Sequence, residues 1–322
     1  MLLLSFDPPT KILLINHRRS YLLSIAIAVC GSILFSGKAI LIKLAYQYGT
    51  TSEVLLALRM IFAFPLFWLV YLCSKERKNN SPLLRKDLLK LLWLGFSGYF
   101  ISSYLDFLGL YYISAGLERI ILYLTPAIVI VISYFVLHKP ISKLQWLSIL
   151  IGYVGVILAF IEDVGGNNAN IWLGVGLVFA SACFYAGYLI FSGEMVKRIG
   201  SIRLVTYASS FSAIFSILQI LFHSPHAIIE QVPQIYFLSL INALVCTVFP
   251  ILMTMISIER IGSSLTSQAG ILGPVSTIFM GWYFLKEEVN LLQIFGLILV
   301  IGAVWLLVNN KESKSEVRTS VL

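Results

Sequence analysis

Charged residues are scarce in this sequence. Asp, Glu, Lys and Arg make up 12% of the 322 residues, whereas hydrophobic residues make up 59%. A soluble globular domain carries about 25% charged residues, so that class of protein is excluded. The apolar residues extend along the whole chain, which also excludes one membrane anchor attached to a globular body. The bilayer is therefore the expected solvent.

Motifs for nucleotide binding, hydrolysis and metal binding are also missing. The chain has no glycine-rich phosphate loop, zinc-binding His pair or nucleophile elbow. Its four cysteines have neither metal-ligand spacing nor a disulfide pattern, which indicates packing residues: Cys30, Cys73, Cys183 and Cys246. We therefore expect no cofactor and no metal, and any energy for function must come from gradients.

Apolar runs of membrane-spanning length recur through the chain. A spanning helix needs about 20 apolar residues, because a rise of about 1.5 Å per residue must cover roughly 30 Å of hydrocarbon. Ten runs meet this length: 21–45, 54–73, 88–110, 114–137, 144–161, 171–192, 204–222, 235–257, 262–285 and 290–308. They lack the alternation of apolar and polar residues that is typical of strands. The sequence predicts an all-α polytopic membrane protein with ten transmembrane helices.

The distribution of Lys and Arg predicts the orientation of these helices, since basic loops stay cytoplasmic. With a cytoplasmic N-terminus, nearly all Lys and Arg between the spans fall in cytoplasmic segments, and the outer loops hold only Lys286. Both termini are then cytoplasmic, and the expected location of the protein is the inner cell membrane. The net charge of +8 thus reflects topology, and no nucleic-acid partner is expected.

The chain contains an internal duplication. Residues 113–145 and 259–293 each hold an apolar helix with a proline, Pro126 or Pro274, then a polar turn and a glutamine 148 positions from its counterpart. An odd number of spans per half requires inversion, so we expect two inverted five-helix repeats. The predicted segments are a cytoplasmic N-terminus (1–20), the first repeat (21–161), a connector (162–170), the second repeat (171–308) and a cytoplasmic tail (309–322).

Several motifs in these segments resemble the drug/metabolite transporter superfamily, specifically proteins with two EamA repeats. They are LALR (56–59), the helix from Gly116 to Pro126, the helix from Gly262 to Pro274 with ILGPVSTIF (271–279), and LKEEV (285–289). The resemblance covers nearly the whole chain and implies export of amino acids or other metabolites; more distant relatives carry nucleotide sugars or sugar phosphates. The first-half turn departs from the pattern, with His138-Lys139-Pro140 in place of its acidic residue.

Six ionisable residues lie inside the predicted spans of the first half: Lys38, Lys43, Arg59, Asp106, Glu118 and Arg119. Helical rise places all of them toward the outer third of the membrane. Each charge in hydrocarbon costs about 2.5–3.5 kcal/mol on insertion scales, so they must face water or one another. We expect Glu118 near Lys38, and Arg119 near Asp106.

Two interpretations of this charged set remain open. In the functional one, the positive surplus binds an anionic group, and Lys38 is the best candidate because it lies deepest. In the structural one, ion pairs lock the helices together, which is favoured for Lys43 and Arg59 because both can snorkel. From the second half, polar residues that could complete a cavity are Tyr185, Asn242 and Gln268.

Pro126 and Pro274 each remove a helical hydrogen bond, and the resulting kinks either line a gate or are inherited bends. Glycines in spans five and ten permit close helix contact within the protein or in a homodimer: Gly152, Gly155, Gly296 and Gly302.

The sequence as a whole favours an exporter of a small polar metabolite that works by alternating access, coupled to a proton or a counter-substrate. A passive channel or a non-transporting membrane sensor is the alternative, and saturable counterflow would separate a carrier from these. An intramembrane enzyme is a weaker alternative, because Asp106 and Glu118 could supply acid or base chemistry but no complete catalytic set accompanies them.

Overall fold

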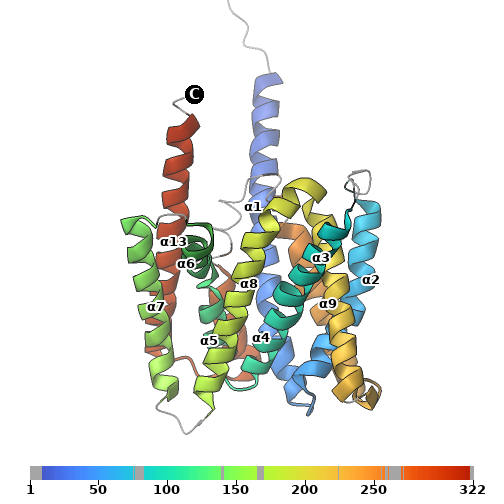
Figure 1. Cartoon of the computed structure of the whole chain (residues 1–322). Helices are drawn as coiled ribbons and strands as arrows, with labels where there is room; N and C mark the ends of the chain where they lie inside the picture. Colours follow the sequence, from blue (N-terminus) through green and yellow to red (C-terminus); the bar gives the residue numbers. More distant parts are fainter. Residues whose placement is uncertain are drawn as a thin grey trace, which may run out of the picture.

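The computed structural model describes residues 9–74, 76, 83–138, 141–164, 170–223, 225–254, 256–257, 260, 270 and 272–319, and every regular element among them is a helix (Figure 1). The long helices are α1 (Pro9–Tyr46), α2 (Ser52–Cys73), α7 (Lys143–Val164), α8 (Ile171–Ile199), α9 (Ser201–His223) and α13 (Leu291–Thr319). The shorter α-helices are α3 (Arg85–Leu94), α4 (Ser102–Leu110), α5 (Ala115–Leu122), α6 (Thr125–Leu137), α10 (Pro233–Ala243) and α12 (Leu272–Met280). π-Helical turns η2 (Gly95–Ile101), η4 (Leu244–Val248) and η5 (Gly281–Leu285), and the 3-10 turn η3 (Pro225–Ile228), complete the list.

The helices have the length and composition of membrane spans. Among the described residues, seven helical segments are long and apolar enough to cross a bilayer, and three shorter apolar helices accompany them: Lys143–Ala159, Leu272–Leu285 and Leu291–Leu306. The predicted all-α, multi-pass membrane class is therefore confirmed at this coarser level. The first turns of α1 and the last turns of α13 project on the same side of the bundle (Figure 1).

The helix bounds differ from the predicted spans at both ends of the chain. α1 begins at Pro9, whereas the first span was expected from residue 21, and α13 continues to Thr319, past the expected end at 308. The backbone of the first and last spans thus continues as helix through segments that were expected to lie outside them. Around the expected connector, α7 ends at Val164 and α8 begins at Ile171.

The duplication is visible in the backbone as well as in the sequence. His138 and Lys286, 148 positions apart, are the two non-glycine residues with positive φ in the described part of the chain, at 53° and 56°. Each follows its helix as a left-handed cap, and its N–H donates to a carbonyl five residues earlier, that of Ser133 or Gly281. Because this conformation is costly for residues with a side chain, its recurrence at equivalent positions reflects a shared local structure.

The starts of other helices in the two halves also correspond. α7 starts at residue 143 and α13 at 291, and α3 starts at 85 and α10 at 233, so each pair keeps the offset of 148. The N–H of Gln145 bonds Ser142 Oγ at 3.3 Å, and that of Gln293 bonds Asn290 Oδ1 at 2.9 Å. Both halves therefore start this helix with a short polar side chain that caps it.

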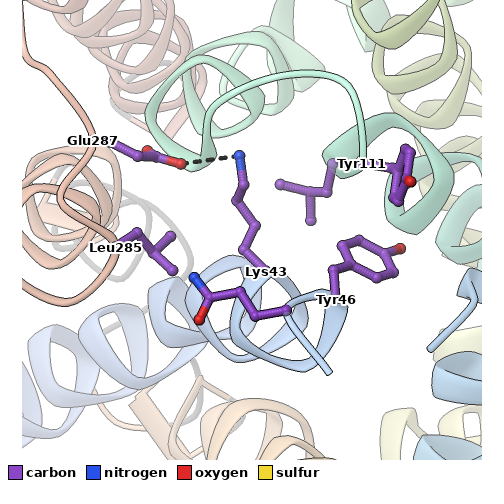
Figure 2. A pocket seen from close by; sticks show the side chains of 7 residues that line it. Lys43, Tyr46, Tyr111, Leu285 and Glu287 are labelled. Atoms are coloured by element: carbon purple, nitrogen blue, oxygen red, sulfur yellow. Dashed lines mark ion pairs between the residues drawn. The ribbon is translucent and has the colours of Figure 1, made fainter. Parts of the chain in front are cut away.

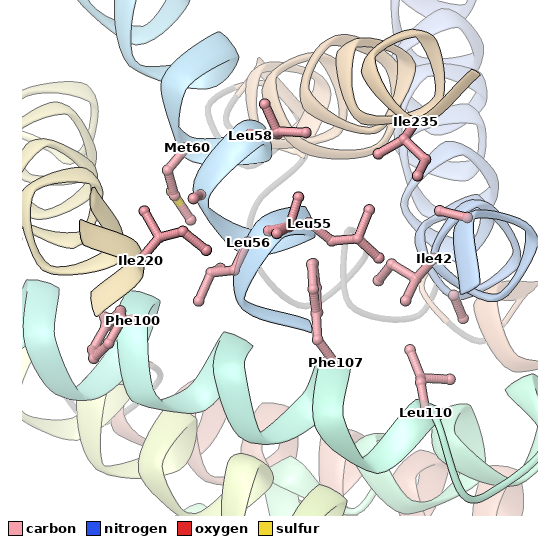
Figure 3. Packing of buried hydrophobic residues seen from close by; sticks show 14 of the residues in the cluster. Ile42, Leu55, Leu56, Leu58, Met60, Phe100, Phe107, Leu110, Ile220 and Ile235 are labelled. Carbon is pink, nitrogen blue, oxygen red and sulfur yellow. The ribbon is translucent and has the colours of Figure 1, made fainter. Parts of the chain in front are cut away.

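The largest apolar cluster joins the two halves around Phe107, which is fully buried (Figure 3). Ile42 of α1, Leu55 and Leu56 of α2, and Ile220 and Ile235 of α9 and α10 surround this ring, directly or through neighbouring side chains. Since α9 and α10 follow the connector, the core near the charged residues is built from both halves. Its dense packing fixes α1, α2 and α4 relative to one another.

A second contact pairs α7 with α13 through glycines. A Cβ built on Gly155 would meet the carbonyl oxygen of Gly296 at 2.8 Å, and one built on Gly296 would collide with that of Gly155. These two glycines therefore allow close backbone approach inside the chain, one of the two alternatives expected for them. A Cβ on Gly302 would meet nothing within 4 Å.

Candidate functional site

A buried ionic cluster lies where α1, α4 and α5 meet. Lys38 Nζ lies 2.5 Å from Asp106 Oδ2 and 3.5 Å from Glu118 Oε1. The exposed fractions of the Lys38, Asp106 and Glu118 side chains are 9%, 3% and 0%. Glu118 lies near Lys38, as expected. Asp106 was expected near Arg119 but forms its ion pair with Lys38 instead. One ammonium thus holds together two carboxylates from different helices.

The carboxylates of this cluster are short of hydrogen-bond donors. Asp106 Oδ1 and both oxygens of Glu118 are buried and accept no hydrogen bond from the described residues. Leaving a buried acceptor without a donor costs about 1–3 kcal/mol, and more when it is charged. Such groups are rare in native proteins, so several of them in one place mark a functional candidate.

Arg119 lies at the junction of α5, α1 and α12. Its Nη2 donates to Ser36 Oγ at 3.2 Å, and its guanidinium carbon lies 4.8 Å from the centre of the Phe35 ring. Ser36 in turn donates to the carbonyl of Gly273 at 2.9 Å. A Cβ at Gly273 would lie 3.4 Å from Nη2, so this glycine leaves room for the guanidinium.

Arg59 is buried inside the bundle. Only 5% of the residue is exposed, and its guanidinium turns toward α4, where Nη2 donates to Ser103 Oγ at 2.8 Å. The guanidinium carbon lies 4.8 Å from the centre of the Phe107 ring, a favourable cation–π distance. Arg59 is thus enclosed by the apolar core around Phe107.

The two proline positions interrupt their spans in similar ways. α5 ends at Leu122 and α6 starts at Thr125, with Pro126 in its first turn. Thr125 Oγ1 donates to the carbonyl of Leu122 at 2.5 Å, the group to which residue 126 of a continuous helix would donate. Pro274 likewise lies in the first turn of α12.

For Pro274 the corresponding carbonyl is that of Gly270, which accepts from the N–H of Gly273 at 2.9 Å and from Ser32 Oγ of α1 at 3.3 Å. A hydroxyl group thus bonds to the carbonyl at both prolines, and at the second one the hydroxyl comes from the helix that carries Lys38.

Of the polar residues proposed from the second half, two can be placed. Tyr185 of α8 is 39% exposed and stacks on Tyr188 with ring centres 5.8 Å apart. Asn242 of α10 is buried, and its Oδ1 has no hydrogen-bond partner among the described residues. Gln268 lies outside the described residues.

Lys43, which sequence reasoning treated as structural, forms a second contact set at the end of the bundle opposite the chain termini. Its Nζ lies 3.0 Å from Glu287 Oε1 and donates to the carbonyl of Ile113 at 2.7 Å. The Glu287 carboxylate also accepts from the N–H of Ala115, the first residue of α5, at 3.0 and 3.1 Å. Figure 2 shows this pair at the edge of a pocket of about 310 Å³ that Tyr46 and Tyr111 also line.

Similar contacts cross between the halves at the other end. The carboxylate of Glu76 accepts from the N–H groups of Ser201, at 3.1 Å, and Arg203, at 2.8 Å, at the start of α9. Asp87 of α3 pairs with Arg198 of α8. At each end, an acidic side chain of one half thus binds a helix N-terminus of the other, where the helix dipole favours negative charge.

Sequence reasoning missed the neutral partners and the role of Glu287. Ser36 and Ser103 are ordinary hydroxyl residues in apolar runs, and nothing in their pattern reveals that guanidinium groups bind them. For Glu287 the sequence did contain a signal, because the LKEEV turn (285–289) carries the acidic residue that the first-half turn lacks. Its partners lie in the other half and could not be identified from spacing.

Comparison with known proteins gives a consistent result. The EamA-like transporter family matches residues 22–161 and 172–309. The chain is 32% identical over 274 residues to the uncharacterized transporter YcbK of Bacillus subtilis, covering 83% of this chain and 86% of that protein. It is 26% identical over 279 residues to an uncharacterized transporter of Synechocystis sp., covering 84% and 83%.

A putative UDP-sugar transporter of Dictyostelium discoideum is 23% identical over 236 residues, covering 71% of this chain and 60% of that protein. A crystal structure of another protein has a similar fold, with a TM-score of 0.61 at 15% identity over 88% of this chain and 95% of the other. The two family matches together span most of the sequence, and they agree with the all-helical membrane architecture. The chain therefore belongs to the EamA-like transporter family.

Proposed function

We propose that this protein carries a small polar metabolite across the membrane by alternating access. One observation carries the proposal: a buried cluster of one ammonium and two carboxylates joins α1, α4 and α5 within a bundle of apolar helices. Ionisable groups at membrane depth are expensive and mark substrate or ion pathways. Because the chain belongs to a family of transporters, a role of this cluster in binding a transported solute or ion is the natural interpretation.

The proposed layout has ten spans in two inverted five-helix repeats, with both termini cytoplasmic in the inner cell membrane. The seven long and three shorter apolar helices support the number of spans. The shared backbone caps at His138 and Lys286 support the repeat. The concentration of Lys and Arg on one side of the predicted spans supports the orientation. In this layout the end that carries Lys43 and Glu287 faces outward.

The proposed binding site contains Lys38, Asp106, Glu118 and Arg119, with Tyr185, Asn242 and Gln268 completing it from the second half. Inverted-repeat transporters hold their substrate where the two halves meet near the bilayer midplane, which supports a site shared in this way. Arg59 supports the site from the apolar core. Coupling to a proton or to a counter-substrate is supported by the carboxylate oxygens of Glu118, which accept no hydrogen bond from the described residues.

Alternating access requires that the contacts at the two ends of the bundle form and break in turn. Lys43, Glu287 and the first turn of α5 close the outer end, and the contacts of Glu76 and Asp87 stabilise the opposite end. The helix breaks before Pro126 and Pro274 supply points at which the spans can bend without leaving a carbonyl unsatisfied. We propose export as the direction of net transport.

The test begins with the metabolites released by cells that express the protein or lack it. A compound enriched outside expressing cells is then followed in proteoliposomes, where a carrier gives saturable counterflow. Lys38→Ala should abolish this flux, whereas Lys86→Ala, at an exposed position of α3, should preserve it. Unsaturable flux without counterflow would identify a channel, and normal flux in folded Lys38→Ala would reject the proposed site.

A further inference from the structure

We infer that Arg119, rather than Lys38, is the residue that binds an anionic group of the transported solute. The inference rests on the proposed function and assigns the charge-recognising residue of its binding site. The charge surplus of the cluster first suggested Lys38, because that residue lies deepest in the predicted spans. The contacts seen in the structure instead favour the guanidinium of Arg119, on α5, as the group that binds the anion.

The cations differ in whether a carboxylate contacts them directly. Lys38 lies between two carboxylates, so its charge is already compensated. Lys43 is compensated by Glu287. Arg119 has no carboxylate partner within the described residues: its contacts there are the hydroxyl of Ser36 and the ring of Phe35. Asp106 and Glu118 act on it only through space.

Within the part of the chain that the structure describes, Arg59 has no carboxylate partner either, but its surroundings differ from those of Arg119. Its guanidinium lies against Phe107, which is 0% exposed in the centre of the largest apolar cluster. Arg119 instead lies against Phe35, with the guanidinium carbon 4.8 Å from the ring centre, and Phe35 is 36% exposed. The guanidinium of Arg119 therefore borders an exposed side chain, whereas that of Arg59 is enclosed by the apolar core.

The neighbours of Arg119 are suited to an anion. A guanidinium offers several N–H donors in a fixed plane, and a single contact to Ser36 leaves others for a carboxylate or a phosphate. Gly273 gives the space that a larger side chain would fill. Tyr123 lies one helical turn after Arg119, with its N–H bonded to the Arg119 carbonyl at 3.0 Å, and its hydroxyl is buried without a hydrogen-bond partner among the described residues, so it is available as a further donor.

A purely structural role for Arg119 makes a different prediction. In that case the guanidinium only joins α5 to α1 and α12, and an added anion would have no effect on it. In our proposal the guanidinium is a receptor, and an anion of the right size stabilises the folded protein through it. The response to anions therefore separates the two roles.

The experiment measures the melting temperature of the purified full-length protein in detergent, at constant ionic strength, with three probes: L-lactate, its neutral amide and inorganic phosphate. The expected result is a rise with lactate or phosphate that the amide does not give. The rise should be lost in Arg119→Gln, with an apparent Kd higher by roughly tenfold or more, and retained in Arg85→Gln, at an exposed position of α3. A response to phosphate alone would assign the site to phosphorylated solutes.

A chemical measurement covers the possibility that Arg119→Gln fails to fold. Phenylglyoxal modifies accessible arginines, and peptide mass spectrometry reports its rate at each of them. The effective anion should slow modification of Arg119 in the unaltered protein and leave Arg85 unchanged. Equal effects of lactate and its amide, no response to either anion, or an anion response that survives Arg119→Gln would each overturn the inference. Export that persists in Arg119→Gln would overturn it while leaving the proposed function intact.

Discussion

Glu287→Gln should open the end of the bundle that lies opposite the termini. The substitution keeps the shape of the side chain but removes its charge. Two contacts involve that charge: the ion pair with Lys43 at 3.0 Å, which is lost, and the hydrogen bond from the N–H of Ala115 at the start of α5, which an amide oxygen accepts more weakly. The first contact joins α1 to the segment after η5, and the second joins that segment to α5. Weakening them should favour states in which these elements separate.

The size of the effect follows from the geometry. At an effective dielectric constant of about 20, unit charges 3.0 Å apart attract by about 5 kcal/mol before desolvation and side-chain ordering are subtracted. Exposed pairs keep about 1 kcal/mol or less, but the Lys43 and Glu287 side chains are only 24% and 16% exposed. A carboxylate at a helix N-terminus adds about 0.3–1 kcal/mol. A net loss of about 2 kcal/mol shifts the balance between closed and open states by about 30-fold.

The assay reads accessibility at Leu110, which lines the pocket beside Lys43 and is fully buried. Leu110→Cys in a variant without the native cysteines should react slowly with a membrane-impermeant maleimide, and Glu287→Gln should raise that rate about tenfold or more. Glu288→Gln, the adjacent carboxylate, is the matched control and should leave the rate unchanged. An unaltered rate in Glu287→Gln, or an equal rise in the control, would show that the pair does not close this end.

Three further substitutions test the packing and the backbone through the melting temperature. Gly155→Leu should destabilise the protein by about 1–3 kcal/mol because its side chain would collide with α13, whereas Gly302→Leu, in open space, should have little effect; equal melting temperatures would contradict the close α7–α13 contact. Thr125→Val should cost about 1–2 kcal/mol by leaving the carbonyl before Pro126 without its hydroxyl donor. His138→Gly should stabilise the protein by up to about 1 kcal/mol because it relieves a φ of 53°, and destabilisation would exclude strain at this cap.

Sequence reasoning predicted well what depends on distance along a helix. The offset of 148 positions recurs in the caps at His138 and Lys286, because equivalent turns need equivalent local interactions. Counting helical rise also grouped Lys38, Asp106 and Glu118 at one depth, and the structure brings these three side chains together. Depth is readable because every residue of a helix adds the same rise.

The partners around each helix axis could not be predicted in the same way. Which face of α5 meets which neighbour depends on how all the helices pack, and that information is spread over the whole chain. Asp106 therefore pairs with Lys38, not Arg119, and Arg119 contacts a serine. Polar hydroxyls in apolar runs give no sequence signal of their own, since they more often bond to their own helix.

The two halves have equivalent helix starts and caps but different charged residues, and this difference bears on how the protein could work. The residues 148 positions after Lys38, Asp106, Glu118 and Arg119 are Ala186, Thr254, Thr266 and Ser267, none of which carries a charge. Ala186 is fully buried in an apolar cluster with Leu117 and Ile121, so the position equivalent to Lys38 has no room for an ammonium group.

A repeated scaffold can place similar hinges and closures at its two ends, because those depend on turns and caps that both halves possess. Recognition of a solute has no such requirement, and a site with charges from one half only can hold an asymmetric molecule in one orientation. In this chain the first half supplies the charges, and the second half supplies Gly273, where a Cβ would lie 3.4 Å from Arg119 Nη2. Movement of one half against the other would then change the surroundings of Arg119 while Lys38, Asp106 and Glu118, all from the first half, stay together.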